Sequence, residues 1–563
     1  MKSGSGISRR AFVAALPAAQ LAAAAEARAP GTEVRLAQAT SGGVDPGVLR
    51  AGIHVVDEDL TIVSDLMLLP GAVIRVSPGR RLVLNGDFLA PIAPVFQGGG
   101  LVDLNGGSAE AAYPEWWGAR PDDGAFDSLP ALEAAVAAHP EVRLAPRDYF
   151  ISRTWRILRG HRRIQGGGSN WQGPGRGTRI VVTSDALDVV QVGPDEKPED
   201  VNSFLQGVVI ADLELSRSRP ALPPSGRTFE APAGLRVRHL LRCEFSRLSA
   251  REHAIGFALG GAVRTFFRDC HAFRSLNSRR PKEDVFHGFH FDGEAEIGLA
   301  GGNASVFLVD CSAGVGGGPP LVRSAGAFLD GAFADSFLIN FETVTVGTGI
   351  QVIGLAASSN GGRRKTGNAN LHIRMPILDQ CLTTGIWISA LSDYAMVDIH
   401  DPYVALAGGA ATAIDLRDGQ GQVSIVGGQL IGWGNFEAGG SAVGIAGRRC
   451  EGLSVSQVKL LGLRRPVELD RCVDFSLEAA INNPDQASEG AAVRVRDCER
   501  GWLRPRIKGK GAFAAALLLE GANERLSIDV TGVEPAAVRG GEAAFVRGAA
   551  GSARGQTIRV TGN

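Results

Sequence analysis

Two aspartates that each precede a glycine are candidates for acid–base chemistry. Asp292 and Asp330 each end a segment in which apolar and other residues alternate. If these segments are neighbouring parallel strands, the two residues lie about 4.8 Å apart. Retaining glycosidases hold two carboxyl groups about 5–5.5 Å apart and inverting ones about 6.5–9.5 Å, and such proximity raises one pKa. The alternative is that both are turn residues, because Asp-Gly steps are common in turns.

A second group of polar residues lies further along the chain. His372 and Arg374 alternate with apolar residues in one segment, and Asp398 and His400 do so in the next. We expect all four to face outward on adjacent strands, with Asn340 in the same column as Arg374 and His400. Arg374 can bind a uronate carboxylate bidentately, and a histidine can take the proton in a β-elimination. The alternative is an ordinary solvated face with paired charges.

Substrate-binding side chains are predicted from an outward column of the first strand in each repeat. That column contains His290, Phe328, Gln351, Trp387 and Asp415. Phe328 and Trp387 offer flat faces for sugar rings. His372 and Asn340 complete the predicted binding residues, and Asp292, Asp330, His400, Asp398 and Arg374 are the catalytic candidates.

A short repeat, which begins near residue 234, positions these residues. In each repeat a small residue precedes an apolar–other–apolar segment, and successive repeats begin 22 to 38 residues apart. The starting residues are Gly234, Gly256, Gly288, Gly326, Gly349, Gly385, Ala413, Ala442, Pro466, Ala492, Ala516 and Ala544. We expect the glycines to lie where a tight coil turns. A second alternating segment, typical of a strand, follows in several repeats, as at 371–374 and 397–400.

Two or three short strands per repeat predict a coil rather than helical hairpins. Each coil can pair in parallel with the next and so build a continuous core. The pattern therefore predicts an all-β fold, a parallel β-helix, and parallel crossover connections favour the right-handed form.

The seven cysteines support the same register. Cys450, Cys472 and Cys498 lie one repeat apart, and free cysteine packs as a small hydrophobic residue. We therefore expect a ladder of buried free thiols. Disulfides or a metal site are the alternatives, although no Cys-x-x-Cys spacing typical of zinc occurs and the odd count leaves at least one thiol free.

Repeat length indicates where a binding groove could lie. The repeats that begin at residues 256, 288 and 349 are the longest, and their additional residues form loops near 274–287, 294–304, 312–325 and 355–370. Insertions in solenoids often build a binding face. We therefore expect the functional groove at about residues 256–430.

Composition excludes several classes of protein. The 563 residues include 75 Gly, 44% hydrophobic residues and 6% aromatic residues, which is unlike a disordered chain, and the glycines lack the three-residue period of collagen. Lys and Arg total 58 and Asp and Glu 59, so the basic excess expected of a nucleic-acid-binding protein is absent. No segment is long and apolar enough for a membrane span.

The N-terminus is typical of an export signal. Arg9 and Arg10 precede an Ala-rich apolar stretch with small-residue cleavage sites. The paired arginines followed by Phe12 indicate a twin-arginine signal; an ordinary secretory signal is the alternative. We expect residues 1–39 to be signal peptide and flexible N-terminus, 40–112 to form N-terminal strands or first coils, and 113–563 to form the β-helix. The mature protein is predicted to be periplasmic or secreted.

One segment carries a family resemblance. Residues 115–127 read EWWGARPDDGAFD, residues 128–138 form an expected short helix capped by Asp127 or Ser128, and residues 144–151 read LAPRDYFI. This order resembles the opening of the pectate-lyase-like superfamily, in its phage-tailspike-like and glycosyl-hydrolase-related branch, although the glycine expected before Tyr149 is missing. The resemblance implies a right-handed parallel β-helix with a short N-terminal capping helix, and action on acidic or complex polysaccharides.

The sequence thus predicts an exported polysaccharide-degrading enzyme, a glycoside hydrolase or a polysaccharide lyase, that works in a groove on the β-helix. The alternative is a non-catalytic glycan-binding or cell-envelope protein that uses the same groove. A polysaccharide and the twin-arginine export machinery are the expected partners. No cofactor or metal is predicted, and the oligomeric state is open.

Overall fold

The computed structural model describes most of the chain, in two compact units. The described residues are 33–36, 47–104, 109–169, 177–221, 228–275, 285–292, 303–316, 323–331, 333–354, 370–393, 395–407, 409–432, 441–483, 490–510, 512–548, 553–554 and 557–559. Unit 1 comprises Met1–Pro121 and Phe126–Arg143, and unit 2 comprises Asp122–Ala125 and Leu144–Asn563. The predicted signal peptide lies almost entirely outside the described residues.

Unit 1 contains short strands in small parallel sheets. The strands are β1 Glu33–Arg35, β2 Val48–Leu49, β3 Gly52–Val56, β4 Leu60–Ile62, β5 Leu66–Leu68, β6 Ala72–Val76, β7 Arg81–Leu84, β8 Phe88–Leu89, β9 Phe96–Gln97, β10 Leu101–Asp103 and β11 Glu141–Arg143. Strands β1 to β10 form three sheets, in the orders β1-β3-β6-β9, β10-β7-β4 and β2-β5-β8. In β6, Ala72, Ile74 and Val76 are buried and alternate with half-buried residues, as the sequence pattern predicts.

The predicted short helix is α3, Leu129–Ala138, in the same unit. Oδ1 of Asp127 accepts a hydrogen bond from the N–H of Leu129 at 3.1 Å, which satisfies one of the free N–H groups of the first turn. Leu132, Ala135 and Val136 are buried. Asp127, rather than Ser128, thus supplies the predicted capping contact.

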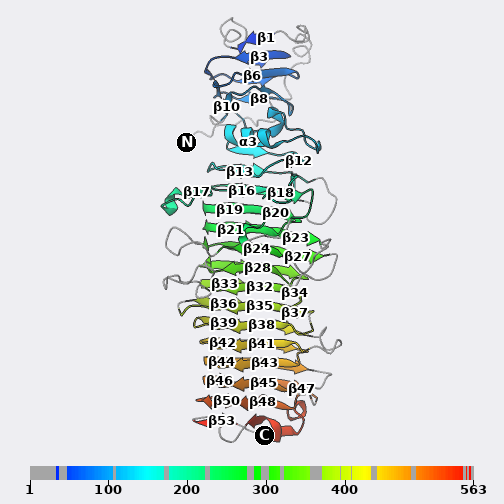
Figure 1. The fold of residues 1–563 in the computed structure, drawn as a ribbon, viewed down its shortest axis with the longest axis vertical. Helices are drawn as coiled ribbons and strands as arrows, with labels where there is room; N and C mark the ends of the chain where they lie inside the picture. Colours follow the sequence, from blue (N-terminus) through cyan, green and yellow to red (C-terminus); the bar gives the residue numbers. More distant parts are fainter. Residues whose placement is uncertain are drawn as a thin grey trace, which may run out of the picture. The chain divides into compact units, whose positions relative to one another are not determined.

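Unit 2 is built from two long parallel sheets, which we call sheet I and sheet II (Figure 1). Sheet I contains β12 Asp148–Ile151, β14 Arg163–Gln165, β15 Arg179–Val182, β18 Val209–Arg217, β20 Glu244–Arg251, β22 Phe266–Arg268, β23 His271–Ser275, β26 Phe307–Val309, β27 Ser312–Gly316, β30 Ser336–Ile339, β31 Glu342–Val344, β33 Asn370–Arg374, β34 Ile377–Cys381, β36 Met396–His400, β37 Tyr403–Leu406, β39 Gln422–Val426, β40 Gln429–Ile431, β42 Leu453–Leu461, β44 Val473–Asn483, β46 Glu499–Leu503, β47 Arg506–Gly509, β49 Asn523–Glu524, β50 Ser527–Asp529, β52 Ala553–Arg554 and β53 Thr557–Arg559.

Sheet II contains the other strands of the coils. It contains β13 Trp155–Ile157, β16 Val190–Val192, β17 Leu205–Gln206, β19 Ala233–Leu241, β21 Ile255–Val263, β24 Phe286–Phe291, β25 Asn303–Ala304, β28 Ser324–Asp330, β29 Phe333–Ala334, β32 Thr348–Ile353, β35 Thr384–Ser389, β38 Thr412–Arg417, β41 Val443–Arg448, β43 Arg465–Asp470, β45 Ala491–Arg496, β48 Ala515–Glu520 and β51 Val546–Gly548.

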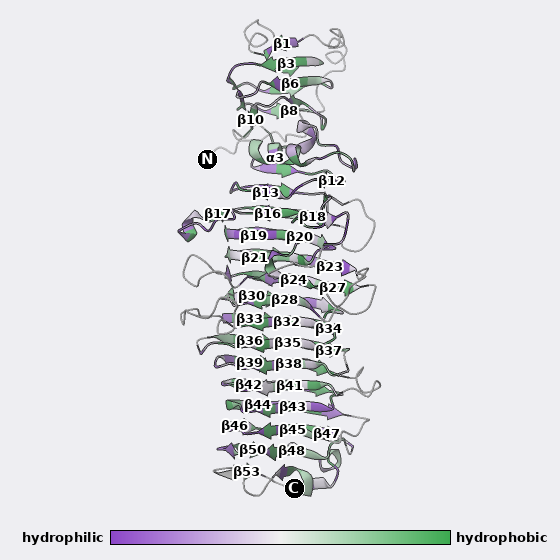
Figure 2. Ribbon diagram, viewed as in Figure 1, coloured by the Kyte–Doolittle hydropathy of each residue, from purple (hydrophilic) through white to green (hydrophobic). Residues whose placement is uncertain are grey.

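A coil in the middle of unit 2 runs from β32 through β33 and β34 to β35. Strand β35 pairs in parallel with β32, and β36 of the next coil pairs in parallel with β33. Apolar residues alternate with polar ones along these strands, so each coil buries one face inside (Figure 2). The predicted right-handed parallel β-helix is confirmed.

In several coils a left-handed residue lies between the two strands that belong to sheet I. Asn340 follows β30 with φ 51°, and Asp310 and Asp401 hold the equivalent places with φ 54° and 49°. Asn and Asp tolerate this conformation best among residues other than glycine. The N–H of Asn340 donates to the carbonyl of Arg374 on the next coil at 2.9 Å. These turns therefore continue the hydrogen bonding from coil to coil.

The glycines at the repeat starts have a different role from the predicted one. All six lie inside strands of sheet II, and none of the six has a positive φ. They are Gly234, Gly256, Gly288, Gly326, Gly349 and Gly385. A Cβ on Gly288 would lie 2.3 Å from the Cβ of Ala313 and 2.5 Å from the carbonyl oxygen of Gly326. Close approach between coil elements, not turning, therefore requires glycine.

The cysteine prediction is confirmed. All seven cysteines are free and buried, and burial raises the pKa of the Cys381 thiol to about 12. Sγ of Cys498 accepts from the N–H of Cys472 at 3.3 Å, so neighbouring coils contact one another through the ladder. Among the described residues, no helix is long and apolar enough to cross a membrane.

Candidate functional site

The predicted outward column of sheet II has the expected register. His290 pairs with Phe328, Phe328 with Gln351, and Gln351 with Trp387. Trp387 pairs in turn with Asp415. Repeat alignment therefore identified which residues share this face.

Part of this column is covered, which contradicts the prediction that His290 faces a groove. His290 is only 2% exposed and packs edge-on against Phe229, with ring centroids 5.3 Å apart. Phe229 belongs to the short helix η4, Thr228–Glu230, far from His290 in sequence. His290 Nδ1 also lies 3.1 Å from His287 Nδ1, and burial, with the charge of Arg323, lowers the pKa of His287 to about 3.

The Asp292 and Asp330 pair is also less open than predicted. Phe291 pairs with Leu329. Asp292 and Asp330 directly follow these two residues, so they lie at equivalent positions on adjacent coils. Asp292 is 5% exposed. Against the effect of burial, the ion pair with Asp188 raises the pKa of Arg236, and the charge of Asp292 adds to this effect. Gly331 has φ 80°, so Asp330 does precede a turn. Burial of Asp292 argues against an accessible carboxylate pair.

The face of Trp387 is partly occupied. The guanidinium of Arg417 lies 5.8 Å from the ring centroid, and Arg417 Nε donates to both oxygens of Asp415 at 3.1 and 3.0 Å. Trp387, Gln351 and Phe328 are half-buried. Sheet II thus offers partial aromatic faces here without convergent acids.

The second predicted column, on sheet I, contains one error. Arg374 pairs with His400 and His372 with Asp398, as predicted. Arg374, however, pairs with Ile339 rather than Asn340. Asn340 is the left-handed turn residue that follows β30, and its Nδ2 donates to Asp310 Oδ1 at 2.8 Å. It therefore does not join the group.

Of the other four residues, three converge on the carboxylate of the fourth, Asp398. Arg374 Nη2 donates to Asp398 Oδ2 at 2.7 Å, and His400 Nε2 lies 2.8 Å from Asp398 Oδ1. His372 Nδ1 lies 3.4 Å from Asp398 Oδ2. The Asp398 side chain is 17% exposed, and those of Arg374 and His400 are each 34% exposed. We call these four residues the Asp398 cluster.

The cluster has the parts of an acid–base site. When each histidine donates one ring N–H to Asp398, its second nitrogen keeps a lone pair. The carboxylate fixes the tautomer and the orientation of the imidazoles, as in other Asp–His pairs. Arg374 retains N–H groups beyond the one bound to Asp398, and these can bind a substrate anion.

An aromatic ladder that the sequence analysis missed leads to this cluster. Phe266 stacks on Phe307 at 4.5 Å between centroids, Phe307 on Phe337 at 5.0 Å, and Phe337 on His372 at 4.6 Å. All four occupy one outward column of sheet I. The rings hold the His372 imidazole from the side opposite Asp398. The signal was available, because phenylalanine is the first residue of β22 and β26 and the second residue of β30.

We predict that the rings of this ladder are energetically coupled. In a double-mutant cycle, Phe307→Ala and Phe337→Ala should show a coupling of about 0.5–1.5 kcal/mol, the usual contribution of an aromatic pair beyond area burial. Phe266→Ala with Phe337→Ala is the control pair, because Phe307 separates these rings. Denaturant unfolding measures both cycles, and equal coupling in the two would refute direct stacking.

A Ser–His–Asp contact also lies on sheet I. His271 Nδ1 lies 2.7 Å from Ser312 Oγ, and His271 Nε2 lies 2.8 Å from Asp269 Oδ1. Ser312 is buried and pairs with Glu342 on the next coil. The carboxylate of Glu342 would repel the negative charge that develops when a serine attacks an acyl group. We therefore assign this contact to coil stabilisation.

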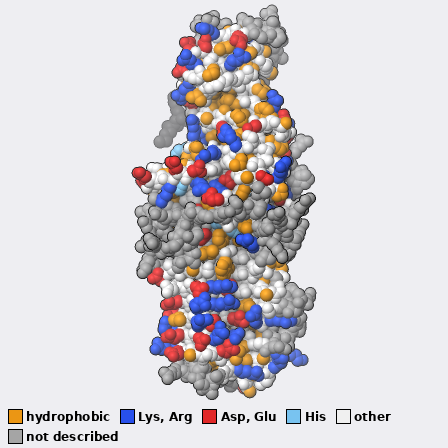
Figure 3. Space-filling view, viewed as in Figure 1, with side chains coloured by type: hydrophobic (Ala, Val, Ile, Leu, Met, Phe, Trp, Pro, Cys, Tyr) orange, Lys and Arg blue, Asp and Glu red, His pale blue; other side chains and the backbone are white. Residues whose placement is uncertain are grey.

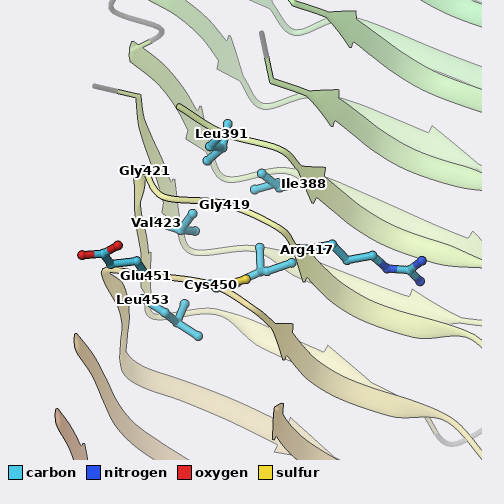
Figure 4. A pocket seen from close by; sticks show the side chains of 10 residues that line it. Ile388, Leu391, Arg417, Gly419, Gly421, Val423, Cys450, Glu451 and Leu453 are labelled. Carbon is cyan, nitrogen blue, oxygen red and sulfur yellow. The ribbon is translucent and has the colours of Figure 1, made fainter. Parts of the chain in front are cut away.

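One interior cavity is a packing gap rather than a binding site. It measures about 10 Å³ and is lined largely by apolar groups, including Ile388, Leu391 and Val423. Figure 4 shows the charged ends of Arg417 and Glu451 pointing away from it. A cavity of this size holds at most about one water molecule.

The loops predicted to form the groove lie largely outside the described residues. The gaps at 276–284, 293–302, 317–322 and 355–369 cover most of them. The groove at 256–430 therefore stays a prediction. Among the described residues, no group of three or more His, Cys, Asp or Glu could hold a metal ion.

Known structures share this fold. No protein-family model matches the chain, and no curated protein matches it. The tailspike protein of Escherichia coli bacteriophage HK620 in complex with a pentasaccharide aligns with a TM-score of 0.60, at 10% identity, over 80% of each chain. A double mutant of that tailspike with pentasaccharide gives 0.60 at 12% identity, and a mutant with hexasaccharide gives 0.59 at 11%, each again over 80% of both chains. These similarities support the β-helix fold that the resemblance implied.

Proposed function

We propose that the protein is an exported polysaccharide lyase that cleaves a uronate-containing glycan at the Asp398 cluster. The observation that supports this most directly is the convergence of Arg374, His372 and His400 on Asp398. The side chains face outward from sheet I and remain partly exposed. An arginine for the substrate carboxylate and an oriented histidine base are the two groups that β-elimination needs.

In the proposed step, His400 takes the proton from C5 of the uronate. The C5–H electron pair forms the C4=C5 double bond, and the C4–O bond to the neighbouring sugar breaks. The departing oxygen receives a proton from water. Arg374 neutralises the carboxylate next to C5 and so stabilises the charge that develops there.

One further observation concerns the substrate and another the type of reaction. The tailspikes that share this fold bind a penta- or hexasaccharide, although at about 10% identity they support only the fold. The burial of Asp292 favours elimination over a two-carboxylate hydrolysis at the predicted pair.

Export is proposed from Arg9 and Arg10 at the start of the Ala-rich segment, and it would place the enzyme in the periplasm or outside the cell.

A polysaccharide screen tests the function. The purified protein should release products with the ultraviolet absorbance of unsaturated uronates from at least one uronate polysaccharide, and none from neutral ones. New reducing ends without that absorbance would indicate a hydrolase. Binding without any product would support the alternative of a non-catalytic glycan-binding protein and would contradict the lyase.

A further inference from the structure

A hollow on sheet II is separate from the Asp398 cluster. It measures about 150 Å³ and is lined by Gly447, Arg448, Glu468, Leu469, Asp470, Arg494 and Arg496. Gly447 and Leu469 are buried, so the accessible lining is charged. Figure 3 shows Lys and Arg side chains, interleaved with Asp and Glu, gathered over the C-terminal coils of unit 2.

The hollow is fixed in shape because its residues come from three paired strands. Arg448 of β41 pairs with Asp470 of β43, and Asp470 pairs with Arg496 of β45. Glu468 pairs with Arg494 in the neighbouring outward column. Side chains on rigid, stacked strands keep their spacing better than side chains on loops.

Both carboxylates of the lining already have arginine partners. Arg496 donates to the two oxygens of Asp470 at 2.9 and 2.8 Å, and with Arg471 it lowers the pKa of Asp470 to about 2. Arg465 donates to Glu468 at 3.3 Å. Neither carboxylate is therefore available to neutralise a further cation.

Arg448 differs from the other two arginines of the lining. Arg494 is paired with Glu520 at 2.7 Å and Arg496 with Asp470. Arg448 is exposed, and no ion pair or hydrogen bond of its guanidinium is found among the described residues. The residues that line the hollow thus carry one cation in excess, and the hollow has room for a group larger than water.

We propose that this hollow is a binding site for the anionic substituent, a carboxylate or a sulfate, of an acidic polysaccharide. Arg448 is the principal ligand, because a free guanidinium presents two parallel N–H donors to such a group. The site lies on sheet II and the Asp398 cluster on sheet I, so it holds the polymer without taking part in cleavage. The choice of a saccharide as carrier of the anion rests on the proposed function.

Binding to variants tests this site. Arg374→Ala and His400→Ala are introduced first, so that the Asp398 cluster neither binds nor cleaves the probe. In this background, calorimetry at low salt should detect binding of oligogalacturonate or a dextran sulfate fragment, but not of neutral maltoheptaose. Adding Arg448→Gln should weaken that binding about tenfold, because a charge-assisted bidentate contact is lost.

Arg163→Gln is the matched control, because Arg163 is also an exposed arginine and belongs to strand β14 of sheet I. It should leave the affinity unchanged. Unchanged affinity after Arg448→Gln, or no binding of either acidic probe, would overturn the site. Complete competition by inorganic sulfate at equal concentration would overturn its assignment to a saccharide. Because this experiment measures binding and not cleavage, its result can be interpreted even if the protein proves to have no lyase activity.

Discussion

Replacement of His400 by Ala is expected to lower the turnover of a uronate polysaccharide by about 100- to 10,000-fold, the usual contribution of a general base. His400 is the histidine closer to Asp398, at 2.8 Å against 3.4 Å for His372. Its side chain is also the more exposed of the two. The initial rate of unsaturated-uronate formation at saturating substrate measures the effect.

His271→Ala is the matched control for this variant. His271 also lies on sheet I and also contacts a carboxylate, that of Asp269 at 2.8 Å, but it lies outside the Asp398 cluster. The control should keep full activity, and both variants should show native circular dichroism. Asp398→Asn should lose activity too, because the amide no longer fixes both imidazoles. Native turnover in His400→Ala would remove the cluster from the mechanism.

Replacement of Gly288 by Ala is expected to lower the free energy of unfolding by about 3 kcal/mol, at the upper end of typical overpacking costs. The new Cβ would lie 2.3 Å from Ala313 Cβ and 2.5 Å from the carbonyl oxygen of Gly326. Because the second contact is with backbone, a side-chain rotation cannot relieve it, and the coils must separate.

Gly409→Ala is the control for that substitution. A Cβ at Gly409 would meet no atom within 4 Å, so the change should stay within about 0.5 kcal/mol. Denaturant unfolding of both variants provides the comparison. Equal stability of the two variants would show that close coil packing does not explain the in-strand glycines.

The repeat predicted the architecture because its signal is local. Alternation in segments such as 371–374 defines which side chains face inward, and stacking then follows from repeat spacing. The same logic correctly paired Arg374 with His400. It failed at Asn340, because alternation does not show where a left-handed residue ends a strand. Ile339 pairs with Arg374, and Asn340 lies one residue beyond that position.

Burial of His290 could not be predicted from the repeat. It depends on Phe229, which lies about 60 residues earlier and belongs to a segment outside the repeated pattern. The role of the repeat glycines was misjudged for a similar reason. A short distance between coils is a property of packing, whereas sequence shows only that a small residue recurs. The aromatic ladder, in contrast, required only that Phe266, Phe307 and Phe337 be read as one column.

The most direct measurement is a crystal structure of the His400→Ala variant with an oligosaccharide of the uronate polymer that the native protein cleaves. The account predicts a sugar carboxylate on Arg374, with C5 of that residue facing the space left by the His400 imidazole. A saccharide bound productively elsewhere, with the Asp398 cluster empty, would contradict it.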